Sequence, residues 1–253
     1  ALELPLGGPL GGHVYRMGRG AVEQHDPITV RALYLEDKET RVVLVSADVY
    51  SISPELRARV LSMLPDSISE NHVILTATHT HNGPGGLSQN WFARRYLGGY
   101  DSAMVDRVVE GIAQVIAEAM VNKARATIGY SVSSKMLLTQ NGFSKGGTRD
   151  DELGVIRVDD SDGNPIAILG SLSAHPDTIG RSNSLAFSAD YPGYFCTKLE
   201  SLSHEKTVAF FLSGAMGDQV CSNRKELSSW DWTEYIGNEL AVNVKSISNK
   251  IDC

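Results

Sequence analysis

The residues best suited to chemistry are histidines that follow apolar, strand-like segments. His79 and His81 stand in the glycine-rich block ATHTHNGPGG, residues 77–86, directly after the apolar run HVILT. On a continuing strand, residues two apart point to the same face, so both imidazoles can converge on one metal ion or one substrate. The glycines let backbone N–H groups approach a ligand closely. Polar turn histidines are the alternative explanation of an isolated HxH, and the glycine-rich context favours a functional site.

Other strand-like segments also end in polar residues. His175 follows the apolar run IAILGSL and precedes a proline, which is the placement expected of a metal ligand or a general base. Asp48 follows RVVLVSA, and Asp218 follows TVAFFL through a glycine turn. Asp190, in SADYPGY, stands at the expected start of a helix. N-capping for Asp190 and turn formation for Asp48 are the structural alternatives to a role in catalysis.

Together these strand ends are expected to face one edge of one sheet, where ligands of open α/β sheets bind. His25, which precedes Asp26-Pro27, is a secondary candidate. The remaining histidines are interpreted as surface residues; they are His13, His72 and His204.

The elements that must position these residues alternate between strand and helix. Strands are expected over residues 29–36, 41–47, 72–78, 126–132, 153–158, 165–172 and 207–212. Helices are expected after Ser53-Pro54, over 101–121, over 194–202 and over 230–247. Two turn sequences, at residues 36–38 and at residues 159–164, each predict a hairpin. Because hairpins are combined with alternating strands and helices, the expected fold class is α/β with a layered, mixed β-sheet flanked by helices.

Length and composition describe an ordinary globular chain. A single domain over residues 1–253 is favoured over two, with 42% hydrophobic and 21% charged residues. The net charge of −7 argues against nucleic acid as a partner.

Targeting signals are sparse. Three cysteines without a CxxC pair favour a reducing compartment, so the cytoplasm is preferred to a secreted location, although the compartment is otherwise undetermined. No uncharged apolar run approaches about 18 residues, so no transmembrane segment is expected. Because the chain begins at Ala1 without a Met, it is interpreted as a trimmed or processed product.

With these residues in place, the sequence resembles the N-terminal domain of the neutral/alkaline, non-lysosomal ceramidases and their short bacterial relatives. The matching segments occur in the same order; they are VSAD at 45–48, ATHTHNGPGG at 77–86, AHPDTIG at 174–180, SADYPGY at 188–194 and GAMGD at 214–218. The resemblance implies that His79 and His175 bind zinc and that His81 lies beside the reacting centre as an acid/base. It also implies hydrolysis of an N-acyl amide, with zinc polarising the carbonyl or lowering the pKa of a bound water to about 7.

Three departures from this family bear on mechanism. Where ceramidases carry a serine in GDVSPN, this chain has Val220, and only a slipped alignment brings Cys221 or Ser222 there. The family's Asn-Arg-Ser segment has its nearest counterpart in residues 141–144, which lack the arginine. The family's glutamate and tyrosine zinc ligands come from sequence beyond the length of this chain.

The leading hypothesis is therefore a zinc-dependent hydrolase acting on an N-acyl amide or a related bond through a metal-activated water. His79, His175 and Asp190 are the predicted metal ligands, and His81, Asp48 and Asp218 are the predicted catalytic residues. Asp48, Asp218, His81 and His25 are further candidates for the third ligand. The partner is a small-molecule or lipid-like substrate, and the oligomeric state is open.

Two alternatives remain. The first is a non-catalytic, ligand-binding relative that keeps the fold and has lost the serine nucleophile. The second is a sugar or phosphate hydrolase that uses carboxylates alone, which would leave the histidine blocks unexplained.

Overall fold

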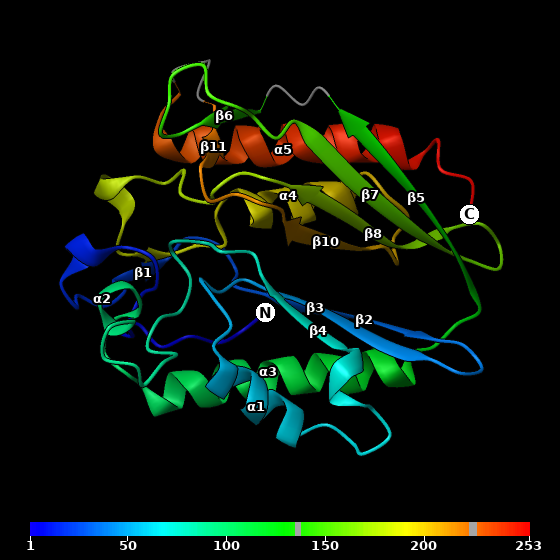
Figure 1. The fold of residues 1–253 in the computed structure, drawn as a ribbon, viewed down its shortest axis with the longest axis horizontal. Helices are drawn as coiled ribbons and strands as arrows, with labels where there is room; N and C mark the ends of the chain where they lie inside the picture. Colours follow the sequence, from blue (N-terminus) through cyan, green and yellow to red (C-terminus); the bar gives the residue numbers. More distant parts are fainter. Residues whose placement is uncertain (135–137, 223–226) are drawn as a thin grey trace. The chain divides into compact units, whose positions relative to one another are not determined.

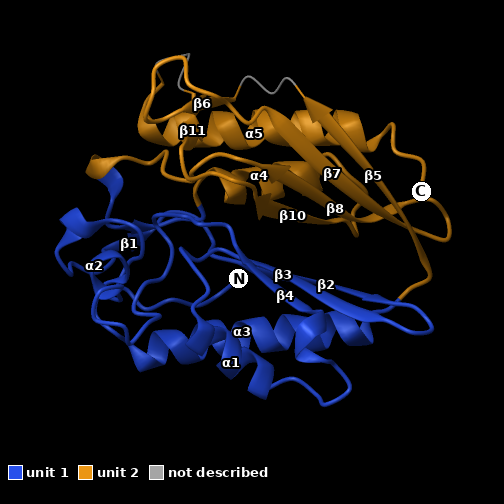
Figure 2. Cartoon of the chain, viewed as in Figure 1, with its two compact units in different colours: residues 1–123, 183–189 blue, residues 124–182, 190–253 orange. Residues whose placement is uncertain are grey.

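The computed structural model describes residues 1–134, 138–222 and 227–253. These residues fall into two compact units (Figure 2). Unit 1 comprises Ala1–Lys123 and Asn183–Ala189, and unit 2 comprises Ala124–Ser182 and Asp190–Cys253. Each unit has its own sheets, helices and hydrophobic core. The single domain expected over residues 1–253 stays a prediction.

Unit 1 is built on a three-stranded sheet in the order β2-β3-β4. β2 (Val30–Glu36) and β3 (Arg41–Ala47) form the expected antiparallel hairpin, and β4 (Val73–Ala77) pairs parallel to β3. The crossover between the parallel strands is helix α1 (Pro54–Ser62), followed by a 3-10 turn over Glu70–His72. The α1 helix begins where predicted, because the Ser53 side chain accepts a hydrogen bond of 3.1 Å from the Leu56 N–H.

One long helix covers this sheet. The α3 helix (Ser102–Val121) is capped by the Asp101 carboxylate, which accepts a hydrogen bond of 3.1 Å from the Met104 N–H. Its apolar stripe is buried, and it packs on β2 and β3 beside α1 (Figure 1). The stripe consists of Met104, Val105, Val108, Val109, Ile112 and Ile116. Burying each such side chain contributes about 1.5–3 kcal/mol, so packing dominates the stability of this helix.

Smaller elements complete unit 1. They are a 3-10 turn (Val14–Arg16), the helix α2 (Arg94–Leu97), and the strands β1 (Glu23–Gln24) and β9 (Ala186–Phe187). Because β1 and β9 pair in parallel, the segment 183–189 is held in unit 1 although its neighbours along the chain belong to unit 2.

Unit 2 is built on a four-stranded mixed sheet in the order β10-β8-β7-β5. β5 (Ala126–Ser134), β7 (Glu152–Asp160) and β8 (Pro165–Leu172) pair antiparallel, as expected for the hairpin predicted across residues 159–164. β10 (Val208–Ser213) pairs parallel to β8 after the crossover helix α4 (Asp190–Ser201). The α4 helix and the closing helix α5 (Ser229–Ser248) pack on each other and on the sheet, burying Phe195 and Phe211 between them.

Like β1 and β9 of unit 1, two short strands of unit 2 were not predicted. β6 (Thr139–Asn141) and β11 (Gln219–Cys221) form a separate antiparallel pair in unit 2. Three residues are too few to give a periodic signal, so only their pairing across the fold defines them.

The mixed α/β class is confirmed, whereas the expectation that all functional strand ends share one sheet edge is wrong. β3 and β4 belong to the sheet of unit 1, and β8 and β10 belong to the sheet of unit 2. After α3 the chain enters β5, which pairs over its whole length with β7 and so starts a second sheet. Each unit instead has its own parallel pair whose carboxyl ends carry predicted site residues.

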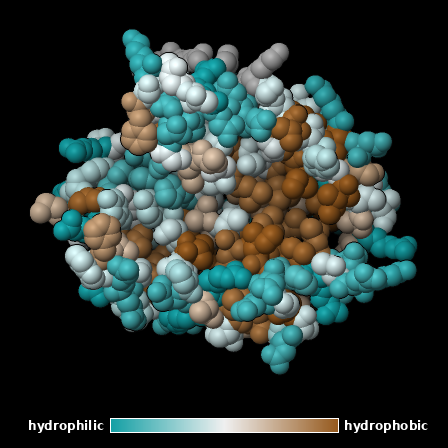
Figure 3. Space-filling model, viewed as in Figure 1, coloured by the Kyte–Doolittle hydropathy of each residue, from teal (hydrophilic) through white to brown (hydrophobic). Residues whose placement is uncertain are grey.

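Apolar side chains also reach the surface. Figure 3 shows hydrophobic side chains at the surface among hydrophilic ones. Over the described residues, no helix combines the length and the apolar character needed to cross a membrane.

Candidate functional site

His79 stands at a sharp turn just beyond β4. The Thr78 and His79 N–H groups donate hydrogen bonds of 2.9 and 3.0 Å to the carbonyls of Ala47 and Val49, which extends the β3–β4 pairing past both strands. His79 then adopts a left-handed conformation, with φ of 67°. For a residue with a Cβ this conformation costs about 1–2 kcal/mol. Backbone strain of this kind clusters at functional sites, which marks His79 as a candidate.

The turn brings the two histidines of the HTH block together. The ring centroids of His79 and His81 lie 5.1 Å apart, with their planes at 74°. The Tyr50 ring stacks on His79 at 4.3 Å and meets His81 edge-on at 5.0 Å. The left-handed turn at His79, and not strand alternation, places both imidazoles against one tyrosine.

A backbone carbonyl fixes the orientation of the His79 ring. Its Nδ1 lies 2.7 Å from the Tyr50 carbonyl oxygen, and a carbonyl only accepts, so Nδ1 carries the proton. The lone pair of the neutral imidazole is then on Nε2. Metal-ligating histidines commonly donate their other ring N–H to a carbonyl or a carboxylate in this way. The His79 side chain therefore fits a metal ligand that binds through Nε2.

His13 belongs to the same cluster, although the sequence interpretation placed it on the surface. Its ring lies 4.9 Å from that of His81 and stacks on Tyr15 at 4.6 Å. The sequence feature that indicates this position is the glycine before His13. Gly12 has φ of +105°, and a Cβ built there would lie 2.6 Å from the His81 Cα. Only glycine allows this close approach of two backbone segments.

A buried arginine organises the loop that carries His81. Arg16 is 2% exposed, and its guanidinium donates hydrogen bonds to the carbonyls of Ser184 (2.5 Å) and Gly11. It also donates to the His81 carbonyl at 2.7 Å and to the Asn82 side-chain oxygen at 3.1 Å. Arg16 thus connects three chain segments of unit 1. No local sequence pattern marks Arg16, because its partners Ser184 and His81 are remote along the chain.

Asp48 lies at the end of β3 and is 2% exposed. Its carboxylate accepts hydrogen bonds from the Thr29 N–H (2.9 Å) and hydroxyl (2.6 Å), and the Arg31 guanidinium lies 3.9 Å away. Burial raises the pKa of Asp48, and Arg31 opposes that rise. These contacts connect the start of β2 to the end of β3, so Asp48 has an evident structural function, and its catalytic role stays a prediction.

His175 in unit 2 repeats the arrangement found at His79. It follows β8, and its N–H donates a hydrogen bond of 2.9 Å to the Gln219 carbonyl. Its Nδ1 lies 2.7 Å from the Met216 carbonyl oxygen, which again leaves the lone pair on Nε2. Its backbone also bridges in parallel to Val220 in β11. The turn after β10 therefore orients this imidazole.

Asp190 is fully buried at the start of α4 with φ of 57°. Its carboxylate accepts hydrogen bonds from the Thr178 N–H (3.0 Å), the Thr178 hydroxyl (2.6 Å) and the Tyr191 N–H (2.7 Å). Burial raises its pKa to about 6, against the effect of these donors. Because Thr178 lies three residues after His175, Asp190 holds the segment that follows this histidine. Its role as a metal ligand stays a prediction.

Asp218 is exposed and takes part in a hydrogen-bonded loop of unit 2. Its two oxygens accept hydrogen bonds from the Gln219 amide (2.8 Å) and the Asn141 amide (2.7 Å), which lower its pKa. The Asn141 side-chain oxygen accepts from the Phe143 and Ser144 N–H groups at 3.0 and 2.9 Å. Asp218 thereby shapes this loop, and a direct catalytic role for it stays a prediction.

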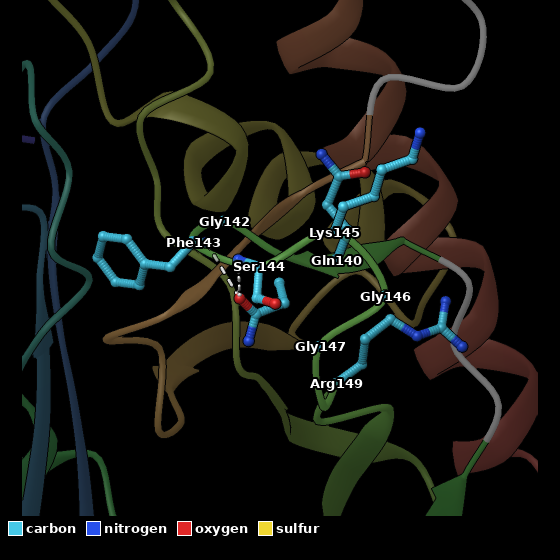
Figure 4. Close-up of a pocket in the computed structure, with 9 residues that line it drawn as sticks. Gln140, Gly142, Phe143, Ser144, Lys145, Gly146, Gly147 and Arg149 are labelled. Atoms are coloured by element: carbon cyan, nitrogen blue, oxygen red, sulfur yellow. Dashed lines mark hydrogen bonds between the residues drawn. The ribbon is translucent and has the colours of Figure 1, made fainter.

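The same loop borders a hollow of about 570 Å³ (Figure 4). Lys145 and Arg149 are among its lining residues and lie away from Phe143, whose ring points to the other side of the loop. Residues 141–144 of this loop are the expected counterpart of the Asn-Arg-Ser segment. The basic residues of the loop are Lys145 and Arg149, and position 142 is glycine.

The candidate nucleophile positions lie in β11 and directly after it. Val220, at the position where the serine is expected, has no nucleophilic atom and pairs with β6. Burial raises the pKa of the Cys221 thiol well above its usual value, which disfavours the reactive thiolate. Ser222 is 6% exposed, and its N–H donates to the Leu138 carbonyl at 2.8 Å. Asn223 of the same motif lies outside the described residues, and exposed His25 stays a secondary prediction.

Comparison with known protein sequences identifies the same family. The family described as neutral/alkaline non-lysosomal ceramidase, N-terminal, matches residues 17–226. Neutral ceramidase from Oryza sativa subsp. japonica is 30% identical over 84% of this chain and 30% of its own length. Neutral ceramidase from Pseudomonas aeruginosa is 26% identical over 70% of this chain and 30% of its own length.

Solved structures agree in fold. The crystal structure of neutral ceramidase from Pseudomonas aeruginosa superposes with a TM-score of 0.87 at 21% identity, over 97% of this chain and 42% of that one. A structure described as ceramidase complexed with C2 gives a TM-score of 0.83 at 21% identity, over 99% of this chain and 43% of that one. The present chain thus spans about a third of the length of these curated relatives and less than half of the solved chains. On the match over residues 17–226, the chain belongs to the neutral/alkaline non-lysosomal ceramidase family and corresponds to its N-terminal region.

Proposed function

We propose that this chain carries the histidine part of a zinc-dependent hydrolase that cleaves an N-acyl amide or a related bond. The observation that carries the proposal is the matching orientation of two imidazoles. The Nδ1 atoms of His79 and His175 each lie 2.7 Å from a backbone carbonyl oxygen, of Tyr50 and of Met216. Each ring in its neutral form therefore offers the lone pair of Nε2 to a metal. That both bind the same ion is inferred from the family pattern.

Zinc, when bound, would polarise the scissile carbonyl and lower the pKa of a bound water to about 7. The residues of this chain supply the remaining functions. The His81 ring packs at 5.1 Å from that of His79, and its imidazole can accept a proton from an attacking group and return it to the leaving amine. The Arg16 hydrogen bond to its carbonyl holds its backbone in place.

The carboxylates contribute chiefly by orientation in this proposal. Asp190, the predicted third ligand, holds the Thr178 segment after His175, and Asp218 shapes the neighbouring loop. A zinc site with an open position needs about three protein ligands, so Asp190 or a residue beyond this chain completes the set.

An N-acyl amide is the proposed substrate class because the relatives are ceramidases. This part of the proposal rests on family membership. The chain covers about a third of those relatives, and substrate selection depends on surfaces that the remaining two thirds of their length can provide.

Zinc content tests the proposal directly. The chain is purified without chelator and loaded with zinc, and bound metal is measured by elemental analysis and titration calorimetry. Wild-type protein is expected to bind about one zinc per chain, and His79→Ala and His175→Ala should each weaken binding at least about 100-fold. His72→Ala, at an exposed histidine, is the matched control and should bind like wild type. Full zinc occupancy in both site variants would contradict the assignment.

The alternative of a non-catalytic, ligand-binding relative is favoured by one observation. Val220 replaces the serine, and the neighbouring Cys221 thiol is buried with a raised pKa. Incubating the zinc-loaded chain with N-acyl amides separates the two functions. Turnover that is lost in His81→Gln supports the hydrolase, whereas saturable binding without turnover supports the binding protein.

A further inference from the structure

Unit 1 carries an exposed surface that is both basic and aromatic. It is made by a turn that follows the first 3-10 segment and by the α2 region, and we name it the arginine–aromatic surface. Its members are Met17, Arg19, Trp91, Phe92, Arg94 and Arg95. The turn and the α2 region adjoin, because one small hollow is lined by residues from both. These residues are Gly18, Arg19, Arg94 and Arg95.

The charge of this surface contrasts with that of the protein. The net charge is −7, with 30 acidic residues, yet residues 4–22 and 71–100 contain no Asp or Glu. These two segments contribute the four arginines at positions 16, 19, 94 and 95. Arg16 is buried and holds the loop of His81, whereas Arg19, Arg94 and Arg95 are exposed. The result is a local positive region on an acidic chain.

Large apolar side chains are exposed beside these arginines. Met17, Trp91 and Phe92 are 90%, 72% and 56% exposed. The Trp91 and Phe92 rings meet edge-to-face at 5.8 Å, and the Arg95 guanidinium lies over the Phe92 ring at 5.9 Å. Exposing large apolar side chains in water is unfavourable, so the exposed Trp91–Phe92 pair beside Arg95 indicates a surface that is covered in use.

Exposed tryptophan and phenylalanine interleaved with arginine match the boundary between lipid headgroups and acyl chains. Aromatic rings insert at the interface, and guanidinium groups bind lipid phosphates with paired hydrogen bonds. Nucleic acid would use charge and aromatic stacking, and neither requires the exposed Met17 side chain. We propose that the arginine–aromatic surface docks unit 1 on membranes that contain anionic lipids.

This surface adjoins the candidate histidine site within unit 1. His13 lines the same hollow as Arg94 and Arg95, and its ring lies 4.9 Å from that of His81. Docking would therefore bring His81 close to the membrane surface, where an N-acylated lipid would reside. That consequence rests on the proposed function, whereas membrane binding itself does not.

Vesicle co-sedimentation with the full chain tests the proposal. Vesicles contain phosphatidylcholine alone or phosphatidylcholine with about a third phosphatidylglycerol. The wild-type chain is expected to pellet with the anionic vesicles at about 0.1 M salt, and to bind much less at about 0.5 M salt or without the anionic lipid. Equal binding to both vesicle types, or no binding to either, would overturn the proposal.

Two pairs of variants separate charge from apolar insertion. The double variant Arg94→Gln/Arg95→Gln should bind anionic vesicles about 30-fold more weakly, because each arginine near such a surface contributes about a fivefold factor. Its charge-matched control is Lys206→Gln/Lys250→Gln, at two exposed lysines of unit 2. Phe92→Ala should weaken binding several-fold, whereas its control Phe143→Ala, at a phenylalanine that is 85% exposed in unit 2, should not. Equal effects of variant and control would count against this surface.

Fluorescence gives a readout that does not depend on turnover or zinc. Anionic vesicles should shift the tryptophan emission to shorter wavelength, and Trp91→Phe should abolish the shift while the chain stays folded. If the chain instead self-associates in ultracentrifugation, and Phe92→Ala abolishes that association without any vesicle binding, a second copy covers the surface and the membrane proposal fails. A negative vesicle result with normal zinc binding would leave the proposed hydrolase intact.

Discussion

The guanidinium of Arg16 donates a hydrogen bond of 2.7 Å to the main-chain carbonyl of His81. The same side chain also donates to Ser184, Gly11 and Asn82. A buried arginine with these partners satisfies several carbonyl groups that water does not reach. The conformation of the HTH block therefore depends on a residue 65 positions earlier in the chain.

The first prediction concerns this arginine. Arg16→Met keeps the length of the side chain and removes its donors, so buried acceptors lose their hydrogen bonds. The free energy of unfolding should fall by about 3 kcal/mol or more, measured by urea unfolding. Arg19→Met, at an exposed arginine three residues later, should change it by less than about 0.5 kcal/mol. Equal stability of the two variants would show that Arg16 does not hold this loop.

A second prediction concerns the glycine that faces His81. Gly12→Ala places a Cβ at 2.6 Å from the His81 Cα, and Gly18→Ala meets nothing within 4 Å. Both glycines have positive φ, of +105° and +79°, so both variants carry backbone strain. Only Gly12→Ala should also displace His81, which we expect to appear as altered histidine resonances in NMR spectra and as weaker hydrolysis if the chain is active. Matching spectra for the two variants would argue against the close approach.

The third prediction concerns the pH dependence of stability. Burial raises the pKa of Asp190 from 3.8 to about 6, so the folded chain binds this proton more tightly than the unfolded chain. The stability contributed by the protonated form is present below about pH 4 and is lost as the pH rises through about 6. The loss is about 3 kcal/mol, since each unit of pKa shift corresponds to about 1.4 kcal/mol.

Unfolding of the zinc-free chain at several pH values measures this effect. Asp190→Asn cannot titrate, so the stability difference between wild type and variant should change between about pH 4 and about pH 7. Asp162→Asn, in the exposed β7–β8 turn, is the matched control for the substitution itself. If the stability difference between wild type and Asp190→Asn does not change with pH, the Asp190 carboxyl lies in a more solvated environment than the structure shows.

The fourth prediction concerns thiol reactivity. Cys196 and Cys221 are buried, and Cys253 is half-buried. Iodoacetamide should label Cys253 alone in the native chain and all three cysteines after unfolding, as counted by mass spectrometry. Cys221→Ala should leave zinc binding and any hydrolysis unchanged. Rapid native labelling of Cys221, or loss of turnover in Cys221→Ala, would instead make it the nucleophile.

The sequence predicted most of the regular elements because their signals are local. The apolar stripe of α3, the Ser53-Pro54 start of α1 and the turn between β7 and β8 lie within one short stretch of chain each. The strand-end positions of His79, His81 and His175 follow from the same local patterns. The family resemblance, carried by five short segments, was confirmed by the match over residues 17–226.

The tertiary structure alone decided how these pieces combine. It separated the strands into two sheets, gave His79 its left-handed turn and placed His13 against His81. It also buried Arg16 between segments that are up to 168 residues apart. A sequence determines local conformation through propensities and short-range capping, whereas contacts between distant segments depend on which strands pair and which side chains fit together. For this protein the sequence identified the types of residue at the site, whereas long-range hydrogen bonds and packing set their orientation.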